Sequence, residues 1–110
     1  MSEPITSAGV PVHQLFGQAF SDQLAQALRN HGYPGTAATV ARSLIVRRCG
    51  CDTDGCATVY LTADRRRAIS LLLPELGHVV IDVDPRDDEL LGIEILDRPD
   101  LTAATAALPC

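Results

Sequence analysis

The chain has 110 residues, enough for one domain that buries roughly 65% of its unfolded surface around an ordinary apolar core. Its hydrophobic fraction is 46%, but only 4% of its residues are aromatic and Trp is absent, so Leu, Ile, Val and Ala must build that core. The formal net charge of -5 argues against binding to nucleic acid, which requires clustered basic groups.

Residues 1–10 contain no basic residue and no apolar run of signal-peptide length. No segment approaches the roughly 20 apolar residues that span a bilayer. We therefore expect a cytoplasmic protein with no membrane partner, folded as a single domain over residues 1–110 with a flexible segment at 1–10. Thiols are normally reduced in the cytoplasm, so clustered cysteines there are more often metal ligands, redox-active or buried than permanently disulfide-bonded.

Residues 12–31 carry apolar side chains at helical spacing and polar side chains on the opposite side. The apolar stripe comprises Leu15, Phe16, Ala19, Phe20, Leu24, Ala27 and Leu28. Gly32 and Pro34 end the pattern, and Gly17 inside it costs about 1 kcal/mol relative to Ala. The pattern predicts one long amphipathic helix that packs on a sheet.

Two strand patterns, at residues 43–49 and 56–62, flank a turn-forming stretch rich in Asp and Gly at 50–55. An antiparallel hairpin in which Cys49 faces Cys56 collects the apolar residues on one face. The facing pairs in this register are Cys49 with Cys56, Val46 with Val59, and Leu44 with Leu61.

The second half of the chain predicts more antiparallel strands. Residues 68–73 are an aliphatic strand followed by a Pro-to-Gly turn at 74–77, and residues 79–84 and 91–96 alternate as the arms of a hairpin. Asp100 caps a short final helix that runs to Leu108. The predicted fold class is α+β, with a long N-terminal helix packed on a four- or five-stranded antiparallel β-meander and a short C-terminal helix.

Three of the four cysteines, Cys49, Cys51 and Cys56, lie within eight residues. Zinc takes four N or S ligands, and structural zinc sites usually separate paired cysteines by two to four residues. Here the two intervals are one and four residues, so a zinc site needs a fourth ligand from elsewhere, either His78 or Cys110.

The same cluster allows two other interpretations. Cys49 and Cys56 can form a cross-strand dithiol with Cys51 as a thiol exchange partner. The adjacent arginines favour a thiolate there, whereas the aspartates of the turn oppose it. Alternatively, these cysteines are small buried hydrophobic residues and bind nothing.

The remaining polar residues do not predict catalysis. The acidic residues Asp82, Asp84 and Glu94 alternate with apolar ones, which is typical of the solvent side of a hairpin, and the stretch Asp87 to Glu89 is typical of a solvent loop. His13, His31 and His78 are dispersed, and no phosphate-binding loop or diagnostic triad spacing is present. The sequence therefore favours a non-enzymatic role.

Two stretches together resemble a group of small bacterial domains of unknown function. They are residues 48–60, where a Cys-Gly-Cys turn is followed by Cys-Ala-Thr-Val-Tyr, and residues 78–96, which end in Gly-Ile-Glu-Ile-Leu. The resemblance covers about residues 45–100. It implies an antiparallel sheet and transfers no catalytic residue.

The leading functional hypothesis is a non-enzymatic module that binds a protein partner or forms a homo-oligomer, because an open antiparallel sheet presents edge strands. On this hypothesis the protein needs no cofactor. The alternative is a structural zinc-binding or thiol redox protein centred on Cys49, Cys51 and Cys56.

Overall fold

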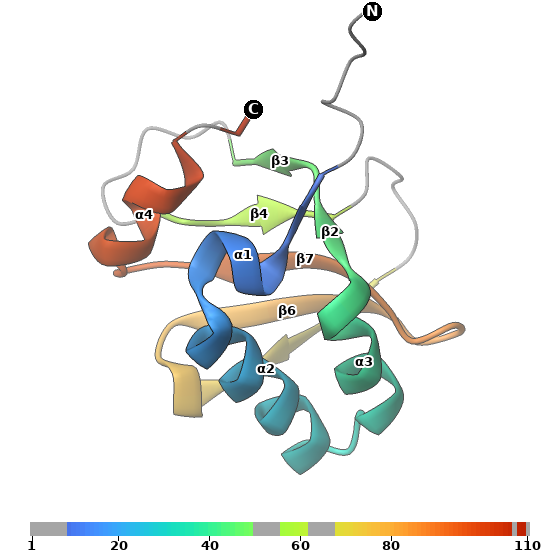
Figure 1. The fold of residues 1–110 in the computed structure, drawn as a ribbon. Coiled ribbons are helices and arrows are strands. Elements are labelled where there is room, and N and C mark those ends of the chain that lie inside the picture. Colours follow the sequence, from blue (N-terminus) through green and yellow to red (C-terminus); the bar gives the residue numbers. More distant parts are fainter. Residues whose placement is uncertain (1–8, 50–55, 62–67, 107, 110) are drawn as a thin grey trace, which may run out of the picture.

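The computed structural model describes residues 9–49, 56–61, 68–106 and 108–109. In this part of the chain a five-stranded antiparallel sheet carries helices on one face, and a two-stranded sheet joins the N-terminal segment to the middle of the chain (Figure 1). The α+β class predicted from the sequence is confirmed.

The elements follow in the order β1 (Val10–Pro11), α1 (Val12–Phe16), α2 (Gln18–Asn30), α3 (Pro34–Thr39), the 3-10 helix η2 (Val40–Arg42), β2 (Leu44–Ile45), β3 (Arg47–Arg48), β4 (Val59–Tyr60), β5 (Ile69–Leu72), the 3-10 helix η3 (Pro74–Leu76), β6 (Val79–Asp84), β7 (Glu89–Ile95) and α4 (Pro99–Thr105). Most of the predicted flexible segment lies outside the described residues, but Val10 pairs with Ile45 between β1 and β2.

The predicted long N-terminal helix is wrong. The segment forms two shorter helices, α1 and α2, which meet at Gly17. Gly17 has a φ of 96°, a conformation open to glycine but strained for other residues, and its N–H ends α1 by donating to the His13 carbonyl over 3.0 Å. Most of the apolar stripe is buried, although Leu15 is half-buried and Ala19 is exposed. The Phe16 and Phe20 rings meet edge to face across the break with centroids 5.3 Å apart.

The five-stranded sheet has the order β3-β4-β7-β6-β5, and every neighbouring pair is antiparallel. The predicted hairpin of β6 and β7 and the predicted strand β5 are confirmed. The prediction of a simple meander is wrong, because β4 pairs with β7 and β5 lies at the far edge of the sheet. Periodicity indicates which face of a strand is buried but does not indicate which strand is its neighbour.

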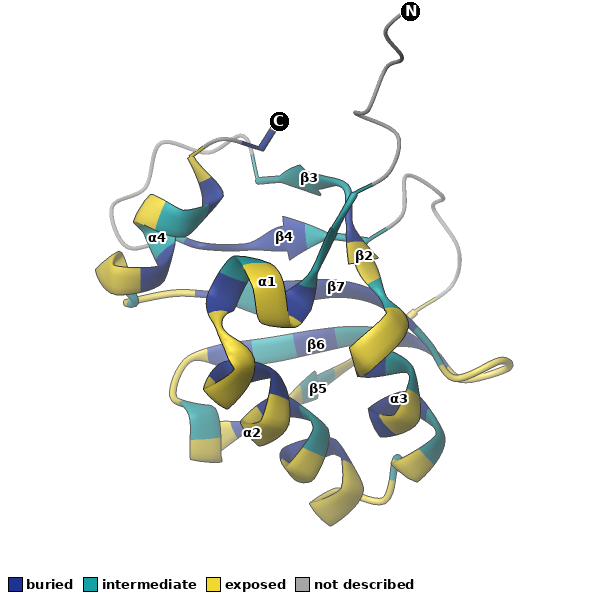
Figure 2. Cartoon of the chain, viewed as in Figure 1, coloured by how far each residue is buried: buried dark blue, intermediate teal, exposed yellow. Residues whose placement is uncertain are grey.

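The core lies between the sheet and the helices (Figure 2). On β6, Val79, Ile81 and Val83 are fully buried, whereas Val80 and Asp82, which point the other way, are half-buried. We call this second side of the sheet the open face, because no helix of the described chain packs on it.

The β3–β4 hairpin forms, but its register is two residues from the predicted one. Arg48 pairs with Val59, and the Cys49 N–H donates to the Thr58 carbonyl over 2.8 Å, so Cys49 faces Thr58 and not Cys56. A shift of two residues keeps each side chain on its own face, which is why the apolar pattern did not distinguish the two registers.

The predicted role of Leu44 is also wrong. Leu44 belongs to β2, pairs with Pro11 in the small sheet and is 43% exposed, whereas its neighbour Ile45 is fully buried. The chain leaves one sheet and enters the other between Ile45 and Arg47, so the alternation of residues 43–49 is not that of one continuous strand.

The predicted C-terminal helix is confirmed as α4. Both of its ends differ from the prediction. The helix ends at Thr105 and not at Leu108, and Arg98 occupies the N-cap position without making a side-chain cap. Asp100 lies in the first turn and binds Arg98 over 3.0 Å instead.

Candidate functional site

Two cysteines of the cluster, Cys49 and Cys56, lie at the end of the sheet where β3 and β4 meet α4. Cys49 follows β3 and Cys56 precedes β4, and both side chains are half-buried. The other predicted ligands Cys51 and Cys110 lie outside the described residues. In the described part of the chain, no three His, Cys, Asp or Glu side chains converge as a metal site.

Two hydrogen bonds join this corner to the C-terminal segment. The Thr102 hydroxyl of α4 donates to the Cys56 carbonyl over 3.2 Å, and the Arg48 N–H donates to the Pro109 carbonyl over 2.8 Å. The residue before Cys49 is therefore hydrogen-bonded to the residue before Cys110, although the two are 61 positions apart in the sequence.

His78, the other predicted fourth ligand, lies at the same end of the sheet as Cys56 but two strands away, and its imidazole pairs with Asp97. It precedes β6, and β7 lies between β6 and β4. Its Nδ1 is 2.7 Å from the Asp97 carboxylate, and both side chains are largely exposed.

A row of five residues crosses the open face, one from each strand: Arg47, Tyr60, Gly92, Asp82 and Ser70. The Arg47 guanidinium lies 4.2 Å from the centre of the Tyr60 ring. Gly92 leaves room for its neighbours, because a Cβ there would lie only 3.1 Å from the Asp82 carboxylate. The Ser70 hydroxyl donates to that carboxylate over 2.8 Å.

Glu94, on β7, belongs to the adjacent row and shares a hydrogen bond with Asp82. This bond, partial burial and the Asp82 charge together raise the pKa of Glu94 to about 7. Burial, followed by the negative charges of Cys49 and Glu94, raises the pKa of Tyr60. The open face therefore changes its charge near neutral pH.

Asp82 and Glu94 lie on the predicted solvent side of the hairpin, but Asp84 does not. Its side chain is only 1% exposed, and its Oδ1 accepts the Arg86 N–H over 3.0 Å. Asp84 thus holds the β6–β7 turn by an Asx-type contact, a role that strand alternation does not predict.

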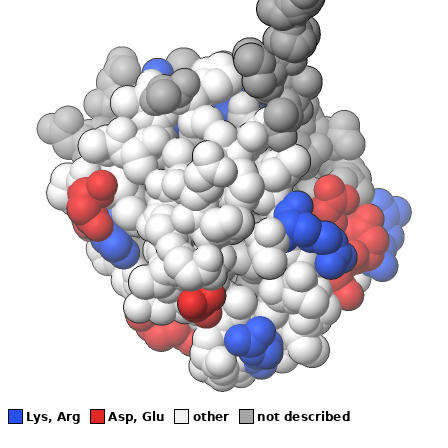
Figure 3. All heavy atoms as spheres, in the orientation of Figure 1, with Lys and Arg blue, Asp and Glu red and all other residues white. Residues whose placement is uncertain are grey.

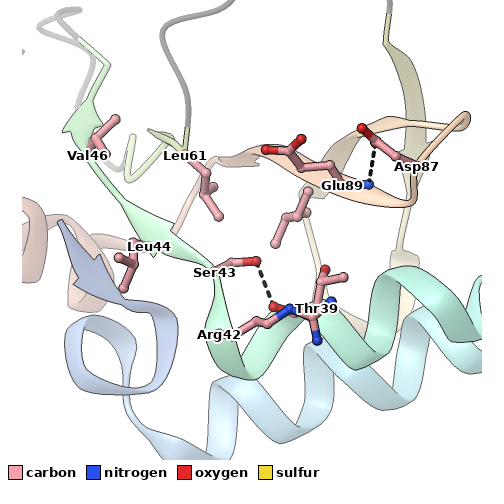
Figure 4. Close-up of a pocket in the computed structure, with 9 residues that line it drawn as sticks. Thr39, Arg42, Ser43, Leu44, Val46, Leu61, Asp87 and Glu89 are labelled. Atoms are coloured by element: carbon pink, nitrogen blue, oxygen red, sulfur yellow. Dashed lines mark hydrogen bonds between the residues drawn. The ribbon is translucent and has the colours of Figure 1, made fainter. Parts of the chain in front are cut away.

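A groove of about 530 Å³ opens where β2 diverges from β7 (Figure 4). Figure 4 shows Arg42 and Ser43 on one wall and Asp87 and Glu89 on the other. Its lining comprises Thr39, Arg42, Ser43, Leu44, Val46, Leu61, Asp87, Glu89 and Leu90.

The polar groups of the groove are partly engaged within their own walls. The Ser43 hydroxyl donates to the Thr39 carbonyl over 2.7 Å, and the Glu89 N–H donates to Asp87 over 3.2 Å. The groove lacks the converging polar groups of a built small-molecule site in the part of the chain described. We therefore place no function there.

The β3 edge of the sheet is covered. The Arg48 N–H donates to the Pro109 carbonyl and its Nε donates to the Leu108 carbonyl over 3.0 Å. The Leu108 side chain is buried in the core, which holds this segment against the strand. Another chain cannot add to β3 without displacing these residues.

The β5 edge is different. Among the described residues, β5 pairs only with β6. The Leu73 N–H donates to the Val79 carbonyl over 2.9 Å, and donors alternate along a strand, so the backbone groups of Ser70 and Leu72 point away from the sheet. No charged residue, proline or bulge interrupts β5 itself, although these are the usual protections of an edge strand.

Exposed apolar side chains border this edge. Leu72 is 60% exposed and lies opposite Val80 on the open face, and Leu96, 49% exposed, lies diagonally beyond Val80. Ile69, at the other end of β5, is 36% exposed. We call Leu72, Val80 and Leu96 the apolar patch.

Charge does not mark a competing surface on the helical side. In the view of Figure 3 the acidic and basic side chains lie mainly around the margin, and the centre is uncharged. Ion pairs within the chain account for several of them, including Arg98 with Asp100.

Comparisons with known proteins add no name to this site: no family model matches the chain, and neither the curated proteins nor the solved structures include a significant match. The resemblance to small bacterial domains stays a prediction. Within the described residues, no helix is both long and apolar enough to cross a bilayer.

Sequence reasoning anticipated that the sheet would present edge strands but did not identify the free one. The signal that was available is the uncharged aliphatic stretch at residues 68–74. An uncharged aliphatic stretch is ordinary in a central strand and indicates a binding edge only when the strand lies at the edge of the sheet, which the sequence does not show.

Proposed function

We propose that the protein is an interaction module that docks an extended partner strand on the free edge of β5. The observation that carries this proposal is the contrast between a covered β3 edge and a β5 edge whose outward backbone groups belong to Ser70 and Leu72. A partner strand gains backbone hydrogen bonds along such an edge, and side-chain contacts at alternate positions give it specificity.

The apolar patch supports the proposal. A strand added beside β5 buries Leu72, the most exposed of the large hydrophobic side chains described, and extends the open face beyond Val80. Burying apolar area contributes about 25 cal/mol per Å², so the patch adds affinity to the hydrogen bonds.

A synthetic peptide tests this proposal without an identified partner. The peptide carries residues 68–73 of the chain itself between terminal lysines, and it is titrated into the isotopically labelled protein. We expect the largest NMR changes, and slowed hydrogen exchange, at the amides of Ser70 and Leu72. If the purified protein is already an oligomer, the peptide should compete for the edge and reduce the oligomer mass.

A control peptide with proline at alternate positions cannot donate along the edge and should not bind. The proposal is wrong if the first peptide neither perturbs these two amides nor reduces an oligomer. Changes confined to the groove at Arg42 and Glu89 would also contradict it.

A second candidate function is a zinc or thiol redox centre at the cysteine corner. The observation that favours it is the Arg48–Pro109 hydrogen bond, because this bond joins the residues that precede Cys49 and Cys110. On this proposal Cys49, Cys51, Cys56 and Cys110 supply four thiolates and His78, paired with Asp97, supplies none.

Elemental analysis of protein purified without chelator tests the zinc form. We expect one zinc per chain, lost in Cys110→Ser and retained in His78→Ala. Thiol titration under denaturing conditions tests the redox form, which predicts fewer than four titratable thiols in metal-free, unreduced protein. Metal-free protein with four titratable thiols contradicts both forms.

A further inference from the structure

We infer that the strand docked on β5 is β5 of a second copy of this chain, paired antiparallel about a two-fold axis that passes between the two Leu71 residues. This inference rests on the proposed function of the β5 edge and names its partner. Three features of the chain lead to it: the β5 strand carries no charge, the β3 edge is covered, and the backbone groups of Ser70 and Leu72 point outward.

The edge is electrically suited to self-association. The chain carries a formal charge of -5, so two copies carry net charges of the same sign and repel each other at long range. Residues 68–74 are Ala-Ile-Ser-Leu-Leu-Leu-Pro and carry no charge. Two copies that meet at this strand bring no ionised side chain of the strand against its counterpart.

The covered β3 edge favours a closed dimer. If both edges were free, β5 of one copy could pair with β3 of the next and the assembly would not close. The bonds from Arg48 to Leu108 and Pro109 occupy β3. Pairing between the two β5 strands is therefore the edge-to-edge contact that the five-stranded sheet leaves available among the described residues, and it is isologous.

The backbone direction limits the register. The outward groups belong to Ser70 and Leu72, and antiparallel pairing requires outward residues to face outward residues. The two-fold axis must therefore pass through Ser70, Leu71 or Leu72. An axis through Leu72 places Ser70 opposite Pro74 of the second copy, which has no N–H and begins η3.

The axis through Leu71 uses only residues that already lie in the ladder with β6. Ser70 of each copy then faces Leu72 of the other. Each of these two pairs exchanges two backbone hydrogen bonds, which gives four between the copies. On the helical face, Leu71 faces its own counterpart and Ile69 faces Leu73. An axis through Ser70 instead pairs the exposed Leu72 with Ala68, which precedes β5.

A charge-swap experiment tests both the partner and the register. Sedimentation velocity over a concentration series, under reducing conditions, compares the full-length wild type with Leu72→Glu, Ser70→Lys and the double variant. We expect the wild type to be a monomer–dimer mixture in the micromolar range and each single variant to dimerise about tenfold more weakly. The double variant should regain most of the lost affinity, because the introduced lysine of each copy then faces the introduced glutamate of the other.

Leu44→Glu is the matched control, because Leu44 is also an exposed leucine on a short strand, and it should dimerise like the wild type. Circular dichroism and thermal unfolding of dilute samples establish that each variant is folded. The charge swap is compatible with the monomer, since position 70 lies opposite Asp82 and the introduced lysine therefore faces a carboxylate.

The outcomes separate this inference from the proposed function. A wild type that stays monomeric at high concentration overturns the inference, while peptide binding at Ser70 and Leu72 would still support the docking edge. A wild-type dimer that Leu72→Glu does not weaken also overturns the inference, and the proposed function falls with it only if the peptide then fails to perturb the Ser70 and Leu72 amides. If the single variants dissociate and the double variant does not recover, the Leu71 axis is wrong; an axis through Ser70 predicts further weakening, because the introduced lysines of the two copies would face each other.

Discussion

At one edge of the sheet, β3 has two residues, both arginines, and the C-terminal segment accepts hydrogen bonds from the backbone N–H and the side chain of Arg48. At the other edge, β5 has four uncharged residues, and nothing in the described chain pairs with its outer side. The two strands thus differ in length, in charge and in what covers them.

The β3 edge is protected twice against the addition of another strand, whereas the β5 edge is not. Arginine side chains disfavour strand addition at β3, and residues 108–109 cover it as well. Among the described residues neither protection is present at β5, and the apolar patch lies beside the edge. Such an arrangement is expected if β5 binds a partner.

The largest effect is expected from uncovering β3. Deleting residues 108–110 removes the buried Leu108 side chain and both carbonyl acceptors of Arg48, and we expect the free energy of unfolding to fall by about 2–4 kcal/mol. Urea unfolding measures this change. The deletion also gives the sheet two free edges, so light scattering should detect species larger than a dimer.

Leu108→Ala is the control for this deletion, because it removes the packing and keeps the backbone acceptors. If the two proteins are equally stable and equally associated, the covering of β3 contributes nothing beyond the leucine side chain.

The next largest effect is expected at Thr58, which joins the β3–β4 hairpin to the centre of the sheet. Its hydroxyl, in a residue only 6% exposed, accepts the Ile95 N–H over 3.0 Å. Thr58→Val leaves that buried N–H without this acceptor and should cost about 1–3 kcal/mol in urea unfolding. Thr58→Ser keeps the hydroxyl and should cost less; a loss as large as that of valine would mean that the methyl group, and not the hydrogen bond, is important.

A smaller, pH-dependent effect is expected at Glu94, between the two edges. Its pKa is about 7 in the fold against an ordinary value of 4.5, so the folded protein retains a proton that the unfolded chain loses. The stabilisation is complete below pH 4.5, decreases as the pH rises, and is lost as the pH passes through about 7. Because Glu94 is partly exposed, solvent screening keeps the change modest.

Glu94→Gln keeps a hydrogen-bond donor toward Asp82 and should remove this slope between pH 5 and 7, measured by urea unfolding over a pH series. Glu75→Gln is the control: hydrogen bonds from the backbone and from His31 lower the pKa of Glu75, so its loss affects only more acidic conditions. A slope that persists in Glu94→Gln would mean that another group causes it.

The smallest effect on stability is expected at β5 itself. Leu72→Glu changes a side chain that is 60% exposed, and in dilute, monomeric samples the free energy of unfolding should change by less than about 0.5 kcal/mol. A large loss in dilute samples would show that Leu72 supports the monomer, and the contrast between the edges would weaken.

Much of the fold follows from local pattern. The α+β class, the β6–β7 hairpin, β5 and the closing helix were predictable because each depends on alternation or helical spacing within a short segment. The sequence showed Gly17 only as a weak position in one helix, because a glycine lowers helix stability by only about 1 kcal/mol and many helices contain one. The positive φ that ends α1 at this glycine is set by the packing of α1 and α2 and is not visible in the sequence.

The candidate site depended on long-range pairing. The sequence determined that residues 68–73 form an uncharged aliphatic strand and that three cysteines lie close together in the sequence. Only the tertiary structure decided that β7 inserts between β4 and β6, which leaves β5 at an edge, and that Pro109 returns to Arg48. Strand order and register depend on contacts between residues far apart in the sequence. The alternation of apolar and polar residues along a strand looks the same whichever strand lies beside it and after any register shift of an even number of residues, so it determines neither.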